Sequence, residues 1–591
     1  YTETTGNPVT ITNYSYGAGF QWDFGAAAQP ATSTALSPTV VYSEPGLYPV
    51  RLIAANTIGC YDTSYTTIEV FPDNLLPTDN AVVCASEPTQ MQFINHYLIE
   101  RILDTYTDAS GNTYVTGYKY EPFSWWASYN LFYNKYDASG HLVWARYWPA
   151  NSHGNSPFDY YYQCIGTSIA ADNEGNVYIG GSFAGINMKI GGVPVFTDAN
   201  PSAENAFIVK LDPAGALLWS ARYFGPGGTS IVAPTELFLE NDNRLAVLIS
   251  GRFLTVQTAT QTVATDPNNF VLLYGMRFDS TGALLQHVPI GKPLLYNSEV
   301  YADYNPDPGQ WLTSRITRIA PRMQRQPNGD WMLSGFFRGK IMWDTIVMEP
   351  LRPSNLNGFV LRLDNDFNVK KAFATFSADD NYQNGTGYTN QLINLPFATD
   401  NSGNVYQSVS LGTDEYSWTG PGSIPIPEAS IYLNDTLPAF GDRCHFLLKY
   451  DPDGQLLWSL RSGNAHFSHL APQPDGSVFG MANYGHALGL NARSGQKFGK
   501  AALGQLDLAL VHWSAEGDIL GVIDLATTGY DHGNWLAAMP DGKLAMFYSQ
   551  GGNFLQGDTS EIRLTIFDPA GLCPAIPLSI AGQPADAAFC A

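Results

Sequence analysis

The sequence predicts an all-β protein in two parts, a small two-sheet sandwich followed by a circular array of four-stranded sheets. Glycine and proline number 56 and 38, and aromatic residues make up 13% of the 591 residues. This composition is typical of short strands joined by turns. Residues 1–72 alternate between apolar and polar types with the period of a strand. From residue 100 onward a unit of two hairpins recurs, and such repeats decide an architecture.

Charge and hydropathy limit the partners that this chain can have. Its net charge is −23, and such a surface repels phosphate backbones and anionic membranes, so we expect no nucleic-acid partner. No run of about 20 apolar residues is present, and we expect no membrane span. The first residues, Tyr1 to Gly6, resemble the interior of a longer protein. We therefore expect a mature product or a segment of a longer chain, located outside the cell or on its surface.

The six cysteines are Cys60, Cys84, Cys164, Cys444, Cys573 and Cys590. None forms a C-x-x-C pair, which argues against zinc ribbons and thioredoxin chemistry. An even number of cysteines in a β protein rich in glycine and proline fits an oxidising compartment. Buried free thiols are the alternative.

The N-terminal part, residues 1–73, contains the motifs of one small domain. They are Trp22-Asp23-Phe24-Gly25, then Pro38 to Tyr42, then Pro45 to Val50, and finally Gly59-Cys60. Together they resemble a PKD domain, an immunoglobulin-like sandwich that serves exported proteins as a spacer or adhesion module. Ala26-Ala27 stands where the family has Asp-Gly, so we expect an altered turn. The resemblance implies that Trp22 and Tyr42 lie in the sandwich core.

The repeated unit is built from two kinds of turn. The first leads into a strand that often begins with Asn-x-Tyr, and the second precedes a strand rich in Leu and Trp. Copies of the first turn begin at Asp108, Asp172, Glu240, Gln326, Asp400, Gln473 and Met539. Copies of the second begin at Asp137, Asp212, Asp279, Asp364, Asp451, Ser514 and Asp568.

Each unit supplies four strands, and stacking such sheets around an axis buries both of their faces. We therefore predict a seven-bladed β-propeller of four-stranded blades over residues 100–574, entered through a linker at 74–99. The D-x-x-G-N-x-Y and G-x-L-L-W patterns resemble the SBBP-type repeat of bacterial propellers. That resemblance implies an exported surface protein, often of the type IX secretion kind, and no enzyme activity.

Two aromatic groups are candidate contacts for a glycan or protein partner. Trp125, Trp126 and Tyr129 lie in the long connection of the first blade, and Tyr160, Tyr161 and Tyr162 lie between the first two blades. Aromatic faces stack on sugars and anchor protein partners. The alternative is that the rings pack this connection onto the propeller.

Candidate chemistry is sparse, and we predict no catalytic, cofactor-binding or metal-binding residue. His466, His469 and His532, with Asp531, would form a metal site if they converged at one end of the channel. Polar loop packing is the alternative that we favour. The turn from Asp364 to Asn368 offers oxygen ligands to calcium, although an ordinary β-turn accounts for it. No G-x-S-x-G motif occurs in a strand-to-helix context.

The cysteines and the chain ends suggest two connections, one within the propeller and one between copies of the chain. Cys84 precedes the first blade and Cys573 follows the last, so we predict a disulfide that closes the propeller; Cys164 and Cys444 should stay unpaired. The tail, residues 575–591, resembles the opening strand of a PKD-like domain and ends near Cys590. We expect it to donate a strand to the sandwich of another copy, bringing Cys590 to Cys60 and joining copies end to end.

These observations favour a secreted structural or adhesive surface protein, assembled with other copies and in contact with surface glycans or proteins. The alternative is an extracellular polysaccharide-binding protein, or a propeller enzyme that acts on glycans.

Overall fold

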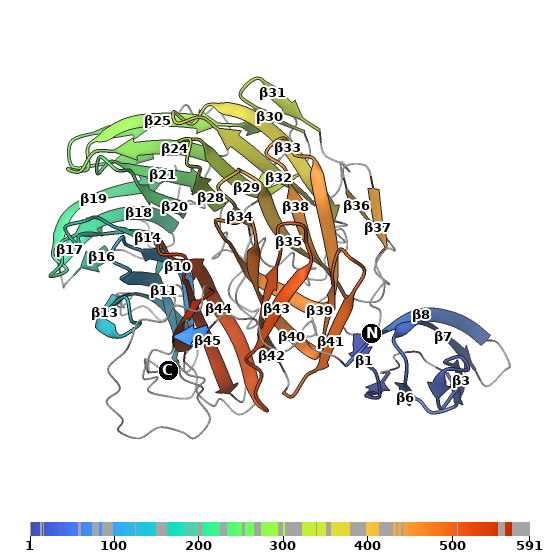
Figure 1. Cartoon of the computed structure of the whole chain (residues 1–591). Helices are drawn as coiled ribbons and strands as arrows, with labels where there is room; N and C mark the ends of the chain where they lie inside the picture. Colours follow the sequence, from blue (N-terminus) through green and yellow to red (C-terminus); the bar gives the residue numbers. More distant parts are fainter. Residues whose placement is uncertain are drawn as a thin grey trace, which may run out of the picture. The chain divides into compact units, whose positions relative to one another are not determined.

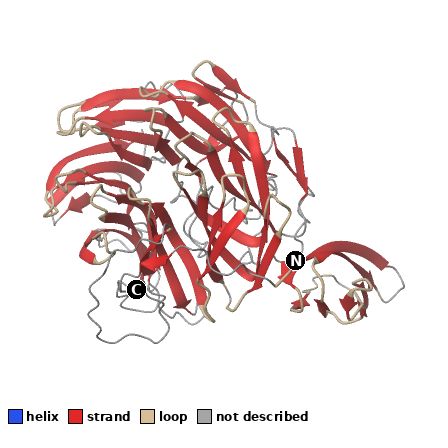
Figure 2. Ribbon diagram, viewed as in Figure 1, coloured by secondary structure: helices blue, strands red, loops and turns tan. Residues whose placement is uncertain are grey.

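All regular structure in the described residues is β-strand, in agreement with the predicted all-β class (Figure 2). No stretch of these residues forms a helix that is long and apolar enough to cross a membrane. The computed structural model describes residues 2–11, 13, 15, 17–56, 61–73, 82–84, 99–123, 126–148, 162–184, 187–190, 193–197, 204–224, 233–250, 255–264, 273–293, 299–301, 322–338, 340–349, 356–378, 397–412, 429–432, 435–438, 443–504, 506–552 and 562–569.

The N-terminal strands form two sheets, a five-stranded sheet in the order β1-β8-β7-β3-β5 and a three-stranded sheet in the order β2-β6-β4 (Figure 1). Their alternating apolar residues meet in one core, which contains Trp22 and Tyr42. The prediction that these two side chains are buried is confirmed. The strands are β1 (Thr2–Thr4), β2 (Pro8–Thr10), β3 (Gly19–Asp23), β4 (Ala28–Gln29), β5 (Thr32–Ser33), β6 (Thr39–Tyr42), β7 (Gly46–Ala55) and β8 (Tyr61–Phe71).

Four-strand repeats follow, and each neighbouring pair within a repeat is hydrogen-bonded. Repeat 1 contains β10 (Ile99–Thr107), β11 (Thr113–Phe123), β12 (Trp126–Tyr136) and β13 (Leu142–Trp148). Repeat 2 contains β14 (Tyr162–Ala171), β15 (Val177–Ala184), β18 (Glu204–Leu211) and β19 (Leu217–Phe224). Repeat 3 contains β20 (Ala233–Leu239), β21 (Leu245–Ser250), β24 (Leu273–Phe278) and β25 (Leu284–Ile290). Repeat 4 contains β28 (Arg322–Arg325), β29 (Trp331–Arg338), β32 (Leu356–Leu363) and β33 (Val369–Ala378).

Repeats 5 and 6 share one long strand, β39 (Leu456–Pro472), which pairs with β38 and then with β40. Repeat 5 is completed by β34 (Phe397–Thr399), β35 (Val405–Gly412) and β38 (Arg443–Tyr450), and repeat 6 by β40 (Val478–Asn491), β42 (Asp507–Trp513) and β43 (Ile519–Asp524). Shorter strands are β16 (Asn187–Ile190), β17 (Val193–Thr197), β22 (Thr255–Gln257), β23 (Thr262–Ala264), β26 (Lys292–Pro293), β27 (Glu299–Tyr301), β30 (Ile341–Trp343), β31 (Ile346–Met348), β36 (Ala429–Tyr432), β37 (Asp435–Pro438) and β41 (Lys497–Ala501).

The last sheet takes its fourth strand from the N-terminal side of the repeats. Its order is β44-β45-β46-β9, with β44 (Tyr530–Ala538), β45 (Leu544–Gly552), β46 (Ile562–Asp568) and β9 (Val82–Cys84). Cys84 stands directly opposite Ile566 in this antiparallel pair. Side chains of β10–β12 also share a core with β45 and β46, so the first and last parts of the repeat region lie side by side (Figure 1). Residues 82–84, expected to be linker, therefore form part of a sheet.

The Asp-x-x-Gly turns form the strand connections for the reason that the sequence suggests. At the first turn, Asp108 Oδ1 accepts the backbone N–H groups of Ser110 and Asn112, each at 2.9 Å. The Asn112 side chain donates to Asp108 Oδ2 at 2.9 Å, and Gly111 adopts a φ of 81°. The same arrangement recurs at Asp172 and Asp400. A carboxylate that binds the turn amides, with a glycine in the left-handed region, gives each hairpin its tight bend.

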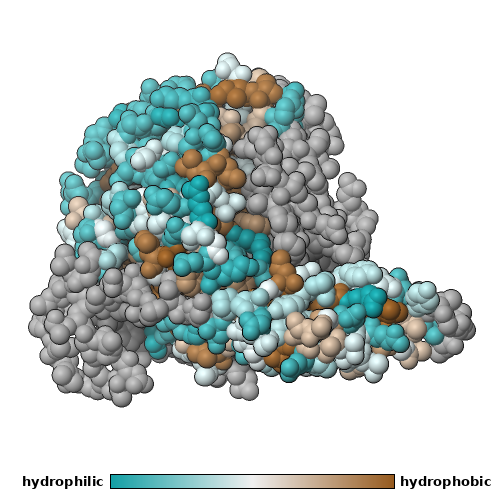
Figure 3. Space-filling view, turned by 45° about the vertical axis from the view of Figure 1, so that its right-hand side comes forward, coloured by the Kyte–Doolittle hydropathy of each residue, from teal (hydrophilic) through white to brown (hydrophobic). Residues whose placement is uncertain are grey.

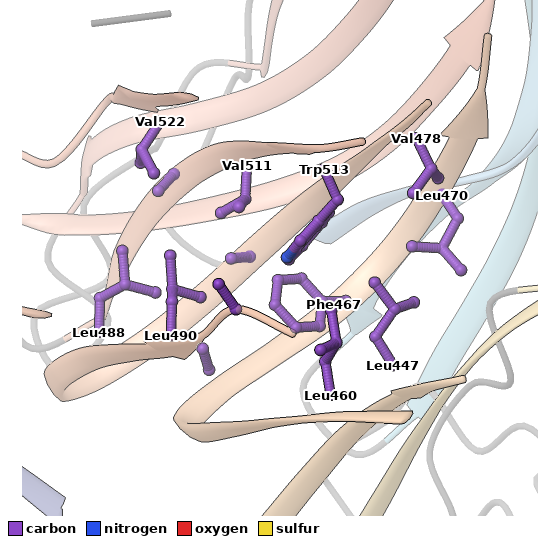
Figure 4. Packing of buried hydrophobic residues seen from close by; sticks show 14 of the residues in the cluster. Leu447, Leu460, Phe467, Leu470, Val478, Leu488, Leu490, Val511, Trp513 and Val522 are labelled. Atoms are coloured by element: carbon purple, nitrogen blue, oxygen red, sulfur yellow. The ribbon is translucent and has the colours of Figure 1, made fainter. Parts of the chain in front are cut away.

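The chain divides into two compact units. One contains residues 1–80, 378–533 and 549–552, and the other contains residues 81–377, 534–548 and 553–591. In the first unit the main core lies between the sheets of repeats 5 and 6, where Phe467 meets Trp513 edge-on with ring centroids 4.9 Å apart (Figure 4). In the second unit successive repeats share cores in the same way. Buried aromatic and aliphatic faces thus provide most of the contact between neighbouring sheets.

A recurring hydrogen bond also joins neighbouring repeats. In each case a side chain of one repeat donates to the backbone carbonyl of the second residue in a turn of the next repeat. The pairs are Arg146 to Pro213 at 2.7 Å, Trp219 to Ser280 at 3.1 Å, Arg277 to Asn365 at 2.8 Å and Trp458 to Ala515 at 3.1 Å. In two of these pairs the donor is the tryptophan of the Leu-Leu-Trp pattern, and in the other two it is an arginine. We call this contact the inter-repeat latch.

The leucines of the same pattern face outward. Leu218 and Leu285 are about half exposed, whereas Trp219 is buried. On the face drawn in Figure 3, hydrophilic residues cover most of the described surface, and hydrophobic residues form small separate groups. Scattered exposed leucines of this kind are normal for a folded protein and do not mark a binding site.

Candidate functional site

The clearest specialised contact within the first unit joins the sandwich to repeat 6. Strand β40 continues past its pairing with β42 to form a hairpin with β41, in which Gly489 stands opposite Gly499. A Cβ atom at Gly489 would lie 2.5 Å from the Phe71 ring, and one at Gly499 would lie 2.7 Å from Phe71 Cβ. The paired glycines thus leave the space that the fully buried Phe71 of β8 fills. We call this contact the sandwich dock.

Charge complements shape at the sandwich dock. Glu69 lies on the same face of β8 as Phe71 and is 3% exposed. Its carboxylate forms an ion pair with Arg461 of β39, and its Oε1 lies 3.6 Å from Lys497 Nζ of β41. A buried carboxylate is costly without a charged partner, so this contact requires both basic residues in place. Among the described residues, the sandwich dock is the contact in which shape and charge are most clearly complementary.

Basic residues of the third strand in several repeats pair with the acid of the first turn. Lys210 Nζ lies 3.2 Å from Asp172, and Arg277 binds Glu240 through two nitrogen atoms. Burial raises the pKa of Asp172, but the hydrogen bonds from Asn176 and the Lys210 ammonium outweigh it and hold that pKa below its usual value. The signal was present in the sequence, because a basic residue stands two positions before these second turns. The pairing serves the fold.

A second pair of acids lies where repeat 6 meets the loop before β44. Asp507 and Asp531 are both fully buried. Asp507 accepts the backbone N–H groups of Leu503 and Gly504, and Asp531 accepts the Thr527 hydroxyl at 2.7 Å. Burial raises the pKa of Asp507, and the Asp531 carboxylate adds to that effect. Asp507 therefore holds the loop at Leu503 and Gly504, and Asp531 holds the loop at Thr527, by hydrogen bonds.

The convergence of His466, His469, His532 and Asp531 on a metal site is not found. His466 stands opposite Asn483 on β40 and His469 opposite Met481, with a β-bulge before His469 that changes the register. Within the ranges that the structure describes, no three side chains of His, Cys, Asp or Glu are arranged as metal ligands. The Asp531 carboxylate instead binds Thr527.

The segment from Asp364 to Asn368, where calcium was the alternative to a turn, has the hydrogen bonds of a turn. Asp364 Oδ1 accepts the backbone N–H groups of Asp366 and Asn368, and its Oδ2 accepts the Asn368 side chain, each at 2.9 Å. The segment is an ordinary turn in which Phe367 takes a φ of 67° and packs into the core.

The two aromatic groups are brought together only in part. Strands β12 and β14 pair in parallel, with Tyr129 opposite Gln163 and Ser128 opposite Tyr162. Trp126 begins β12, so the backbones of Trp126, Tyr129 and Tyr162 lie at one end of this sheet. Trp125, Tyr160 and Tyr161 lie outside the described residues.

Cys84 and Cys164 lie on strands of the second unit. Cys164, which was expected to stay unpaired, is a buried free thiol, and burial raises its pKa to about 12. Cys84 lies on β9, and Cys444 lies on β38. Cys60, Cys573 and Cys590 fall outside the described residues, as does the tail from 575 to 591. The predicted pairs Cys84–Cys573 and Cys60–Cys590 therefore stay predictions.

The sequence matches no protein-family model and no curated protein. Among solved structures, puromycin hydrolase is similar at 11% identity and a TM-score of 0.31, over 93% of this chain and 62% of that one. The chain thus spans less than two thirds of that enzyme. A quinonprotein alcohol dehydrogenase-like protein from Bacteroides thetaiotaomicron has 9% identity and a TM-score of 0.22, over 89% of this chain and 93% of the other. A member of the DUF4221 family from Bacteroides vulgatus has 9% identity and a TM-score of 0.29, over 68% and 93%. These scores are too low to transfer the role of any residue.

Proposed function

We propose that the chain is a secreted, non-enzymatic protein of the cell surface with a structural or adhesive role. In this proposal a PKD-like sandwich is fixed to a seven-bladed β-propeller. Repeats 1 to 6 would each contribute one four-stranded blade, and β44, β45, β46 and β9 would make the seventh. A strand from before the first repeat that completes the last sheet would join the two ends of such a propeller.

The observation that carries the proposal is the sandwich dock. A spacer that only separates domains needs no buried contact with its neighbour. Here Glu69 is buried between Arg461 and Lys497, and Phe71 fills the space over two glycines. These contacts support a sandwich that is held in one orientation on repeat 6, with its uncovered surface available to a binding partner. The net charge of −23 supports an aqueous location away from nucleic acid and anionic lipid.

Two measurements on the full chain test this function. Protease treatment of intact cells that produce the protein should remove it, while a cytoplasmic marker stays intact. Glu69→Gln should loosen the sandwich, so that limited proteolysis between the sandwich and repeat 1 speeds up, whereas Asp23→Asn on the exposed outer face should leave cleavage unchanged. Protection of the protein in intact cells, or equal cleavage of the Glu69→Gln variant and the parent, would contradict the proposal.

For assembly we propose other copies of the chain as partners. In the described part of the sandwich β2 pairs only with β6, so its other edge is open to an added strand. The segment 577–581 of a second copy has the strand-like sequence for this place. Deletion of residues 575–591 should abolish end-to-end assembly measured by light scattering and leave the circular dichroism spectrum unchanged. Assembly that survives the deletion would rule the partner out.

A further inference from the structure

Two tyrosine rings stand exposed on the outer face of the five-stranded sheet. Tyr61 and Tyr65 of β8 are 75% and 73% exposed, more than any other large hydrophobic side chain in the described residues. Side chains alternate along a strand, so these tyrosines share the face of Glu69 and Phe71. Four residues of strand place the two rings about 13 Å apart along it.

The residues beside the rings come from strands β7 and β3. In register with Tyr61 stand Ala55 and then Gly19, whose small size leaves the ring uncovered at its side. In register with Tyr65 stand Arg51 and then Asp23. Between these two strips Thr63, Ile53 and Gln21 stand in register. The face therefore offers two aromatic rings, one low strip, one polar strip and a single aliphatic side chain between them.

The polar strip carries no net charge. Arg51 Nη2 lies 3.0 Å from Asp23 Oδ2, and both side chains are almost half exposed. Their remaining donor and acceptor positions are available to hydroxyl groups. Because the whole chain carries a charge of −23, a polyanion would be repelled from it, whereas a neutral polymer would not.

We propose that this face binds a neutral polysaccharide, with Tyr61 and Tyr65 stacked on sugar rings and Arg51 and Asp23 hydrogen-bonded to sugar hydroxyls. A protein partner would need a wider apolar core than two separate rings and one isoleucine beside alanine, glycine and an ion pair. The binding face is continuous with the sandwich dock and begins where β40 and β41 stop covering β8. The proposal rests on the adhesive function proposed above and gives its ligand class.

The test is native affinity electrophoresis of the full chain in gels that contain hydroxyethyl cellulose, xylan, dextran or laminarin, with alginate as the polyanion. At least one neutral polymer should retard the parent protein. Tyr61→Ala/Tyr65→Ala should weaken that binding about tenfold, since both stacking surfaces are lost. Tyr61→Phe/Tyr65→Phe should keep most of it. Tyr147→Ala, which removes an exposed tyrosine of repeat 1, should bind like the parent.

The inference is overturned if no neutral polymer retards the protein, if alginate alone does, or if the double alanine variant binds as well as the parent. Protease treatment of intact cells separates this failure from failure of the proposed function. A protein that is removed from cells but binds none of the polymers would lose its polysaccharide assignment and keep its surface role. A protein that binds a polymer through the tyrosines but is protected in cells would do the reverse.

Discussion

The indole N–H of Trp219 donates to the backbone carbonyl of Ser280 at 3.1 Å, and this bond joins repeat 2 to repeat 3. The Trp219 ring also lies over Gly282, where any Cβ would approach the ring to 2.6 Å. Trp458 repeats the arrangement with Ala515 and Gly517. One side chain thus supplies a hydrogen bond and a packing surface to the turn of the neighbouring repeat.

Removal of the latch donor should destabilise the fold. We expect Trp219→Phe to lower the free energy of unfolding by about 1 kcal/mol for the lost hydrogen bond, with a further loss from the smaller ring. Trp458→Phe should lower the free energy of unfolding by a similar amount. Urea denaturation measures both variants, and the latch does not stabilise the fold if neither variant has a lower urea midpoint than the parent.

The glycine beneath the Trp219 ring should be more sensitive than a glycine in an open turn. Gly282 and Gly542 have φ values of 88° and 85°, and a Cβ at Gly542 would meet no atom within 4 Å. Alanine at either position costs about 1 kcal/mol of backbone strain. Gly282→Ala should cost about 1–3 kcal/mol more, because the ring must move. Equal losses of stability in the two variants would show that the close approach is unimportant.

Tyr223 should be better replaced by phenylalanine. Its ring is fully buried, and its hydroxyl has no hydrogen-bond partner among the described residues. Burial raises the pKa of this hydroxyl well above its usual value. We expect Tyr223→Phe to stabilise the protein by about 1 kcal/mol, since a buried unsatisfied group is removed. A loss of more than about 1 kcal/mol in thermal or urea unfolding would mean that the hydroxyl is bound after all.

Asp507 and Asp330 should have opposite effects on the pH dependence of stability. Burial raises the pKa of Asp507 above 3.8, so the folded state holds this proton more tightly and stability falls as the pH rises from 3.8 through the raised pKa. Burial also acts on Asp330, but Lys370 and Arg362 outweigh it and lower the pKa, so its contribution is present above 3.8 and is lost as the pH falls through the lowered pKa.

The parent should lose stability as the pH rises above 3.8 because of Asp507, and Asp507→Asn should abolish that decrease. The parent should also lose stability as the pH falls below 3.8 because of Asp330, and Asp330→Asn should abolish that second decrease. Urea midpoints from pH 3 to 7 measure both slopes. Parallel curves for the parent and both variants would contradict the assigned directions.

The turns and the sandwich core could be predicted because their signals are local. Asp108 and Gly111 lie three positions apart, and Trp22 lies in an alternating strand, so nearest-neighbour chemistry decides both. The sandwich dock could not be predicted in this way, since Glu69 and Arg461 are 392 residues apart and no pattern links them.

Strand β9 and the exposed tyrosines show the same limit. Val82–Cys84 is a three-residue strand whose partner, β46, lies at the far end of the repeats. Alternation places Tyr61 and Tyr65 on one face, but whether a neighbour covers that face depends on the tertiary structure. The oxygens of Asp531 and Asp364 bind local donors, which residue type alone does not reveal.

Strand β9 joins the two ends of the repeat region through its pairing with β46, and a single cross-link tests this pairing. Ile566→Cys in a Cys573→Ser background places a cysteine directly opposite Cys84 in the antiparallel pair, at a separation suited to a disulfide. Peptide mapping without reductant should then recover residues 84 and 566 in one linked fragment, absent from the Cys573→Ser parent. If Cys84 instead reacts fully with iodoacetamide in the folded double variant, β9 does not pair with β46 and the repeat region is not closed by this strand.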